Sequence, residues 1–172
     1  MNEQRWLILI YRLPREPSRP RVAAWRKLKM LGALYLQDGV AALPEDAVTR
    51  EQLEWLQVQI REANGEAVLW EAQPNTSLED KELVEAFRSA REEAYRTLIA
   101  GAKRIERKAQ LGGGSKALLE ELGKLEREFR AERRRDYFRS PIRQEATSAL
   151  KAARRAVREG AAGGDANVRS GS

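Results

Sequence analysis

Two clusters of basic side chains are the residues of this sequence whose types and spacing could do chemistry. The first follows a short apolar run and consists of Arg12, Arg15, Arg19, Arg21, Arg26, Lys27 and Lys29. Its first arginines lie where a predicted strand gives way to a predicted helix, and a helix N-terminus presents free N–H groups and a positive dipole end. Guanidinium groups beside such an end predict a site for a phosphate or another oxyanion. The alternative is a solvated helix face that forms salt bridges with the acidic middle of the chain.

The second cluster lies near residue 130 and consists of Arg127, Arg130, Arg133, Arg134, Arg135, Arg139 and Arg143. Helical periodicity places Arg127, Arg130 and Arg134 opposite a leucine seam, so this row faces outward and could follow a nucleic-acid backbone. The alternative is ordinary helix support, because Glu126 precedes Arg130 by four residues. The neighbouring Tyr137 adds a ring that can stack on a base.

Other kinds of site are limited by composition, because the sequence contains no cysteine and no histidine. A thiolate nucleophile, a Ser-His-Asp triad and the usual zinc or copper sites are therefore excluded. The carboxylates that could form an acid–base pair or bind magnesium are Glu45, Asp46, Glu51, Glu54, Glu62 and Glu66. They lack the spacing of a metal-binding loop, and Asp38 is expected to be a turn residue beside Gly39. We therefore expect no catalytic residue, no metal and no cofactor, and a protein that is not an enzyme.

The charge of the chain, +6 in total, changes sign twice along its length. Residues 1–30 carry eight Lys/Arg against two Asp/Glu, residues 31–95 carry five against fourteen, and residues 96–172 carry nineteen against ten. Two basic segments thus flank an acidic one, which is more informative than the total charge. The apolar run near the N-terminus is too short for a secretory signal, and no run is long enough for a membrane helix. We expect a cytoplasmic protein that makes no contact with a membrane.

Hydrophobic periodicity predicts an α+β domain in residues 1–74. The predicted strands are 6–11, 33–37, 40–44 and 66–72, and the predicted helices are 19–31 and 49–64. The Asp-Gly dipeptide at 38–39 predicts a hairpin with a type I′ turn, and Thr49 is expected to begin a capping box. This β-α-β-β-α-β order is that of a ferredoxin-like domain, in which the first and third strands are central and both helices cover one face. Aromatic side chains on these elements are expected to pack in the core, namely Trp6, Tyr11, Trp25, Tyr35, Trp55 and Trp70.

Residues 75–159 are predicted to form a long αα-hairpin followed by a C-terminal helix. A second capping box at 76–79 opens a helix that ends near Gln110, and a glycine-rich loop leads to Ser115 as the next cap. The following helix has an apolar seam of Leu118, Leu122, Leu125 and Phe129. Ser140 is expected to cap a last helix that begins at Pro141 and ends near Arg158. Residues 160–172 are expected to form a disordered tail.

Several stretches of the sequence resemble the N-terminal domain of ChrB, a family of chromate-resistance regulators. The longest runs from Trp6 to Lys29 and continues from Leu31 to Gly39, and shorter ones are 49–56 and 136–141, the last reading Asp-Tyr-Phe-x-Ser-Pro. The resemblance covers about residues 6–157. The ferredoxin-like part also resembles, more distantly, the central domain of the phenylacetate repressor PaaX and the small CRISPR adaptation subunit, which form dimers.

The resemblance implies a DNA-binding transcriptional regulator that forms a homodimer and responds to chromate or another oxyanion. Since there is no cysteine, anion recognition would depend on arginine. The family continues into a second, chromate-resistance domain, whereas this sequence is expected to end in a loose tail. The residues that we expect to contact DNA or the anion are Arg12, Arg15, Arg19, Arg21, Arg26, Lys29, Arg133, Arg134, Arg135 and Tyr137. Two alternatives stay open: a module that binds a protein partner, such as a separate chromate-resistance domain, and a magnesium-dependent nuclease that uses Asp38.

Overall fold

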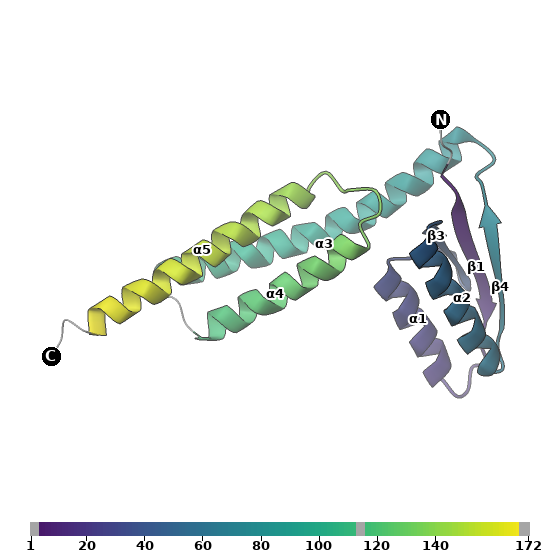
Figure 1. Cartoon of the computed structure of the whole chain (residues 1–172), viewed down its shortest axis with the longest axis horizontal. Coiled ribbons are helices and arrows are strands. Elements are labelled where there is room, and N and C mark those ends of the chain that lie inside the picture. Colours follow the sequence, from purple (N-terminus) through teal and green to yellow (C-terminus); the bar gives the residue numbers. More distant parts are fainter. Residues whose placement is uncertain (1–3, 113–115, 169–172) are drawn as a thin grey trace. The chain divides into compact units, whose positions relative to one another are not determined.

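The structure, a computed structural model, describes residues 4–112 and 116–168, and residues 163–168 by their backbone alone (Figure 1). The chain forms two compact units, Met1–Phe87 and Arg88–Ser172. The first contains a sheet with helices and the second is helical, so the predicted α+β class is confirmed. In chain order the elements are β1 (Trp6–Arg12), α1 (Arg19–Leu31), β2 (Leu34–Gln37), β3 (Val40–Pro44), α2 (Ala47–Glu62), β4 (Glu66–Ala72), α3 (Ser77–Gly112), α4 (Lys116–Arg134) and α5 (Arg143–Val168).

The sheet of the N-terminal unit has the strand order β2-β3-β1-β4, and every neighbouring pair is antiparallel. This order places β1 and β3 in the centre, as the crossover rule predicted. Helices α1 and α2 lie on the same side of the sheet (Figure 1). Leu7 and Leu9 of β1 point to that side and are fully buried, as are Leu28 of α1 and Leu53 of α2. Burial of these side chains is the main stabilising term for the unit.

Both edges of the sheet are protected against pairing with another strand. At the β4 edge, the side chains of Gln57 and Arg61 donate hydrogen bonds to the backbone carbonyl of Ala67, at 3.1 and 2.8 Å. At the other edge, β2 is short and its register with β3 shifts between Tyr35 and Gln37. Occupied carbonyls and irregular short strands both discourage edge-to-edge association.

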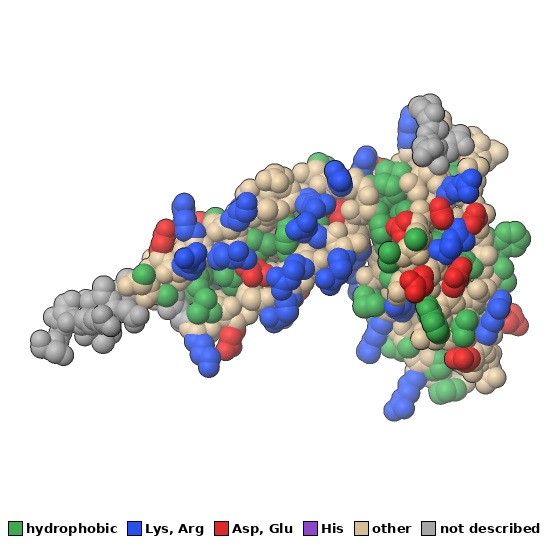
Figure 2. All heavy atoms as spheres, viewed as in Figure 1, with side chains coloured by type: hydrophobic (Ala, Val, Ile, Leu, Met, Phe, Trp, Pro, Cys, Tyr) green, Lys and Arg blue, Asp and Glu red, His purple; other side chains and the backbone are tan. Residues whose placement is uncertain are grey.

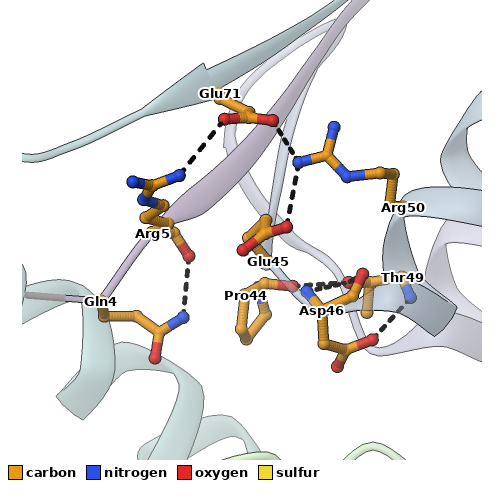
Figure 3. Close-up of polar contacts among 8 residues, drawn as sticks. All are labelled: Gln4, Arg5, Pro44, Glu45, Asp46, Thr49, Arg50 and Glu71. Carbon is orange, nitrogen blue, oxygen red and sulfur yellow. Dashed lines mark hydrogen bonds and ion pairs between the residues drawn. The ribbon is translucent and has the colours of Figure 1, made fainter. Parts of the chain in front are cut away.

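The N-terminus of α2 is capped by Asp46 and not by Thr49 (Figure 3). The Asp46 carboxylate accepts the backbone N–H of Thr49 at 2.8 Å, and the Thr49 hydroxyl accepts the N–H of Asp46 at 3.0 Å. The predicted capping box at Thr49 is therefore wrong, because a carboxylate three residues earlier already binds that N–H. The second predicted box is confirmed, since the Glu79 carboxylate accepts the N–H of Thr76 at 2.8 Å and Thr76 Oγ1 accepts the N–H of Glu79 at 3.2 Å.

Four charged side chains join the strands to the start of α2 (Figure 3). Arg50 of α2 forms ion pairs with Glu45 and with Glu71 of β4. Arg5, just before β1, lies 3.8 Å from the same Glu71. Glu45, named above among the carboxylates that could bind magnesium, thus takes part in a structural ion-pair network.

The hairpin between β2 and β3 forms as predicted, but its turn differs from type I′. Of the two turn residues, Gly39 alone has a positive φ, 72°, whereas a type I′ turn needs two. The Tyr11 N–H donates to the Gly39 carbonyl at 2.8 Å, and a Cβ at Gly39 would lie 2.5 Å from the Tyr11 carbonyl oxygen. Glycine is therefore required here for its backbone conformation and for the close approach of β1.

The helical unit buries one core among α3, α4 and α5. The predicted α4 seam is confirmed, since Leu118, Leu122 and Phe129 are buried and Leu125 packs against them. Helix α3 runs to Gly112, and the predicted cap at Ser115 lies outside the described residues. No helix within the described residues is both long and apolar enough to cross a membrane.

Helix α5 begins later and ends later than predicted. It starts at Arg143, not at Pro141, and continues to Val168 beyond the expected end near Arg158. The Ser140 hydroxyl is buried and forms no hydrogen bond in the described part of the chain, so the prediction that it caps this helix is wrong. The reason is that α5 begins only at Arg143, so Ser140 lies three residues before the first helical residue, in the bend where its backbone N–H donates to the Asp136 carboxylate at 2.8 Å.

The aromatic side chains are less buried than predicted. Trp6 is buried, stacks on Phe87 at 5.4 Å and donates its indole N–H to Asp80 at 2.9 Å. Trp25, Trp55 and Trp70 are exposed, so their predicted place in the core is wrong. Trp25 and Trp55 lie at the margins of their helices' apolar stripes, and Trp70 lies on the sheet face opposite α1 and α2.

Two glycine-to-alanine substitutions test this description. Gly39→Ala should lower the free energy of unfolding by about 1 to 3 kcal/mol, because alanine is strained at this positive φ and its Cβ would meet a carbonyl oxygen.

In α4, a Cβ at Gly123 would meet only Arg127 Nη1 at 3.6 Å, so Gly123→Ala should raise helix stability by about 0.5 to 1 kcal/mol.

Urea unfolding measures both changes. The four tryptophans, at 6, 25, 55 and 70, all lie in the N-terminal unit, so their fluorescence reports Gly39→Ala, while circular dichroism at 222 nm reports Gly123→Ala. A neutral Gly39→Ala would contradict the described turn.

Candidate nucleic-acid and anion interface

The N-terminal basic cluster lies on β1, the following loop and α1. Arg12 ends β1 and forms an exposed ion pair with Glu66 at 3.3 Å. Arg21 donates to the backbone carbonyl of Arg15 at 3.2 Å, which brings these two side chains to the same part of the loop. Arg19 and Arg26 are exposed on α1. The cluster therefore extends from the end of β1 along α1, and it is partly neutralised at Arg12.

The start of α1 has the features of an anion contact. The Ser18 side chain forms no capping hydrogen bond, and the first turn contains no acidic residue. Arg15, Arg19 and Arg21 are exposed around this end. Uncapped N–H groups and guanidinium groups at one place can together bind an oxyanion.

Two lysines of α1 have partners within their own unit. Lys29 lies over the ring of Trp25, with its ammonium 4.8 Å from the ring centroid. Lys27 hydrogen-bonds to the Gln52 side chain of α2. Both lysines of the predicted cluster thus also have contacts within the fold.

The C-terminal cluster divides into inward and outward arginines. Arg133 and Arg134 are exposed in the last turn of α4. Arg135 turns inward and binds Glu132 at 2.5 Å, and Arg91 of α3 binds the same carboxylate at 2.8 Å. Tyr137 is half-buried in the bend that follows. Of the predicted contacts here, Arg133 and Arg134 are thus displayed to solvent, whereas Arg135 has a structural role.

The bend between α4 and α5 is built around the buried carboxylate of Asp136. One oxygen accepts the Tyr95 hydroxyl of α3 at 3.0 Å, and the other accepts the Ser140 N–H. The Arg143 guanidinium lies 3.8 Å away. Burial, followed by the nearby Asp136 carboxylate, raises the pKa of Tyr95 well above its ordinary value, so the phenol stays protonated and donates. Tyr95 was missed by the sequence analysis because its spacing marks it only as one more apolar position of a helix.

The outward row on α4 is exposed and has no acidic partner. Arg127, Arg130 and Arg134 form no ion pair within the described residues. Glu126, expected to support Arg130, instead binds Arg154 of α5 at 2.6 Å, so the helix-support interpretation is wrong for this pair. Unpaired surface cations are the ones that can exchange counterions for phosphates.

Two cations of α3 share one carboxylate of α4. Glu121 binds Arg104 at 3.1 Å and Lys108 at 3.0 Å. The hydrogen bond from Lys108 is the main cause of the lowered pKa of Glu121, which favours its ionised form. These pairs divide the basic residues into two groups, one neutralised within the fold and one available to a ligand.

The excess of positive charge lies in the helical unit. That unit contains twenty-one Lys/Arg and twelve Asp/Glu, whereas the N-terminal unit contains eleven and fourteen. Figure 2 shows blue side chains gathered over α4 and α5 with few red ones between them, while red and blue mix over α1 and α2. Asp38, the residue of the nuclease alternative, is exposed in the β2–β3 turn.

A double-mutant cycle tests the bend. Tyr95→Phe and Asp136→Ala should each lower the free energy of unfolding by about 1 to 3 kcal/mol, because each leaves a buried polar group without its partner. The double variant should lose less than the sum, by about 1 kcal/mol or more, since both remove the same hydrogen bond. Circular dichroism during thermal or urea unfolding gives the values, with the exposed Glu128→Gln of α4 as a near-neutral control. Additive losses would show that the two side chains do not interact.

Comparison with known proteins places the chain in a family. The family model described as "Protein ChrB, N-terminal" matches residues 21–163, which covers β2 to α4 in full and most of α1 and α5, but not Arg12, Arg15 and Arg19. No curated protein and no solved structure matches the sequence. The match spans most of both units, so the chain belongs to the ChrB N-terminal family, which is linked to chromate resistance.

Proposed function

We propose that this protein is a ChrB-type regulator that binds DNA and controls chromate-resistance genes, without enzymatic activity. The observation that carries the proposal is the row of Arg127, Arg130 and Arg134 on α4, which is exposed and without an acidic partner in the described chain. At a rise of about 1.5 Å per residue the row is about 10 Å long, which matches about three successive phosphates of one strand. Arg133 lies in the same last turn and adds a further charge.

The anion response is proposed to reside at the start of α1. Arg15, Arg19 and Arg21 surround an uncapped helix end there. Chromate is a tetrahedral dianion, and guanidinium groups bind such oxyanions through charge-assisted hydrogen bonds. Chromate, or another oxyanion of this shape, would compete with a DNA phosphate for these arginines and weaken DNA binding.

Titration of DNA binding against salt tests the main proposal. Fluorescence anisotropy of a labelled operator fragment should give a steep fall of log K with log salt, with a slope of about −0.9 per phosphate contact. Arg127→Gln/Arg130→Gln/Arg134→Gln should make the slope shallower by about 2 to 3 and weaken binding on the order of a hundredfold at 0.15 M salt. Arg104→Gln/Lys108→Gln, which removes cations already paired with Glu121, should change the slope less. A flat salt dependence of the wild type contradicts DNA binding by this surface.

A second titration of DNA binding tests the anion site. Chromate replaces part of the chloride while the ionic strength is held constant. Wild-type binding should weaken, and Arg15→Gln/Arg19→Gln/Arg21→Gln should be less sensitive to chromate. If chromate weakened DNA binding equally in both proteins, the anion response would not depend on these three arginines at the start of α1.

Association with a second copy is the remaining part of the proposal, and the open face of the sheet supports it. We propose a ferredoxin-like class for the N-terminal unit, based on its β-α-β-β-α-β order with β1 and β3 central.

The open face of the sheet carries apolar side chains. On the face opposite α1 and α2, Ile8 pairs with Trp70 and Ile10 with Val68 across β1 and β4. Beside them Trp6, Ile8, Leu34, Leu36 and Leu83 line an apolar groove of about 600 Å³. Exposed apolar patches of this kind mark protein interfaces, which also favours protein binding as a second function.

Substitution of Trp70 tests the dimer. Trp70 is 58% exposed on the sheet face and Trp55 is 62% exposed on α2, so the two offer matched positions. Trp70→Lys should shift the protein from dimer to monomer in sedimentation velocity, because a charge would be buried in an apolar contact, whereas Trp55→Lys should leave the dimer intact. A wild type that stays monomeric at micromolar concentration would exclude this interface.

A further inference from the structure

Helix α5 carries a second row of cations that the sequence analysis did not single out. Lys151, Arg155 and Arg158 are exposed and lie four and three residues apart, and the exposed Arg154 lies between them, so all four lie on one side of the helix. With Glu159 and Ala162 they border a shallow surface hollow of about 460 Å³. The ion pair of Arg155 with Glu159, at 3.6 Å, is highly exposed and therefore contributes little.

Helices α4 and α5 are antiparallel neighbours, and one ion pair fixes their alignment. Arg154 Nη2 and Nε lie 2.6 and 2.9 Å from the same carboxylate oxygen of Glu126. Because the two helices run in opposite directions from the bend, this contact places the middle of α5 beside the middle of α4 (Figure 1). Figure 2 shows the resulting face, with basic side chains over both helices.

We propose that the α4–α5 face binds duplex DNA through two parallel rows, one for each strand. The α4 row is Arg127, Arg130 and Arg134, and the α5 row is Lys151, Arg155 and Arg158. Packed helices lie about 8 to 10 Å apart, so outward rows on neighbouring helices are separated by about that distance or more. The grooves of B-DNA are about 6 and 12 Å wide, so rows at this separation can reach the phosphates on both sides of one groove. A single strand can occupy only one row.

Glu126 is a positioning residue in this arrangement. Its carboxylate is mostly covered and neutralises Arg154 at the seam between the two rows. The pair holds the rows at a fixed separation without adding net charge. The inference rests on the proposed DNA binding. It adds a second DNA-binding row, on α5, and a preference for duplex over single-stranded DNA.

The experiment compares a labelled 20-base-pair duplex with one of its strands, by anisotropy over a range of salt concentrations, with the full chain. The α5 variant is Lys151→Gln/Arg155→Gln/Arg158→Gln. The control is Arg96→Gln/Lys103→Gln/Arg107→Gln, which removes the same charge from exposed positions of α3 in the same unit. Circular dichroism checks that each variant is folded.

The wild type should bind the duplex more tightly than the single strand. The α5 variant should lose this preference, and its duplex salt slope should become shallower by about 2 to 3, since about 0.9 is lost per phosphate contact. The control should keep the preference. Equal losses in the control and the α5 variant would mean that net charge alone matters, and would overturn the two-row site.

The remaining outcomes separate this inference from the proposed function. An unchanged α5 variant beside a weakened Arg127→Gln/Arg130→Gln/Arg134→Gln variant would overturn the α5 row and leave DNA binding intact. Equal wild-type affinity for duplex and single strand would also overturn it. Absence of wild-type binding to either would overturn the proposed function itself.

Discussion

The buried carboxylate of Asp136 is the interaction on which the basic surface depends. It accepts hydrogen bonds from Tyr95 of α3 and from the backbone N–H of Ser140, so it joins the bend to the helix on which the bend packs. The chain reverses direction there, and only because it reverses do the cations of α4 and α5 lie side by side. A buried carboxylate is tolerated when its acceptor positions are filled, and here donors from two elements fill them. Asp136 and Ser140 of the Asp-Tyr-Phe-x-Ser-Pro motif thus have a role in the fold.

Acidic residues decide which cations remain available. Glu132 holds Arg91 and Arg135, Glu121 holds Arg104 and Lys108, and Glu126 holds Arg154. Each of these carboxylates joins two helices or braces the bend, so each stabilises the helical unit while it removes cations from the surface. The rows on α4 and α5 are among the cations that these three carboxylates do not bind. A count of charges along the sequence shows the excess of positive charge in the helical unit. The acidic partner of each cation, however, follows only from the packing of the helices.

The parts of the fold that could be predicted are those that depend on local periodicity. The bounds of α1 and β4, the central places of β1 and β3 and the buried seam of α4 all follow from apolar spacing and the crossover rule. What could not be predicted depends on residues that meet only in the folded chain. Asp46 caps α2 ahead of Thr49, Arg135 turns inward because Arg91 and Glu132 are there, and Trp70 is exposed because neither α1 nor α2 covers its face. The α5 row lies within the predicted last helix, but its place beside the α4 row follows only from the reversal of the chain at the bend.

The two units therefore present surfaces that respond oppositely to ionic strength. The N-terminal unit offers apolar side chains on an uncovered sheet face, and salts that are excluded from protein surfaces strengthen apolar association. The helical unit offers unpaired guanidinium and ammonium groups, whose attraction for a polyanion is screened over about 10 Å at 0.1 M salt. Association between copies would persist in salt that releases DNA, so the oligomer would not depend on the nucleic acid. In the proposed regulator the contacts with DNA are electrostatic and the contact between copies is apolar, so salt would release the DNA while the copies stay together.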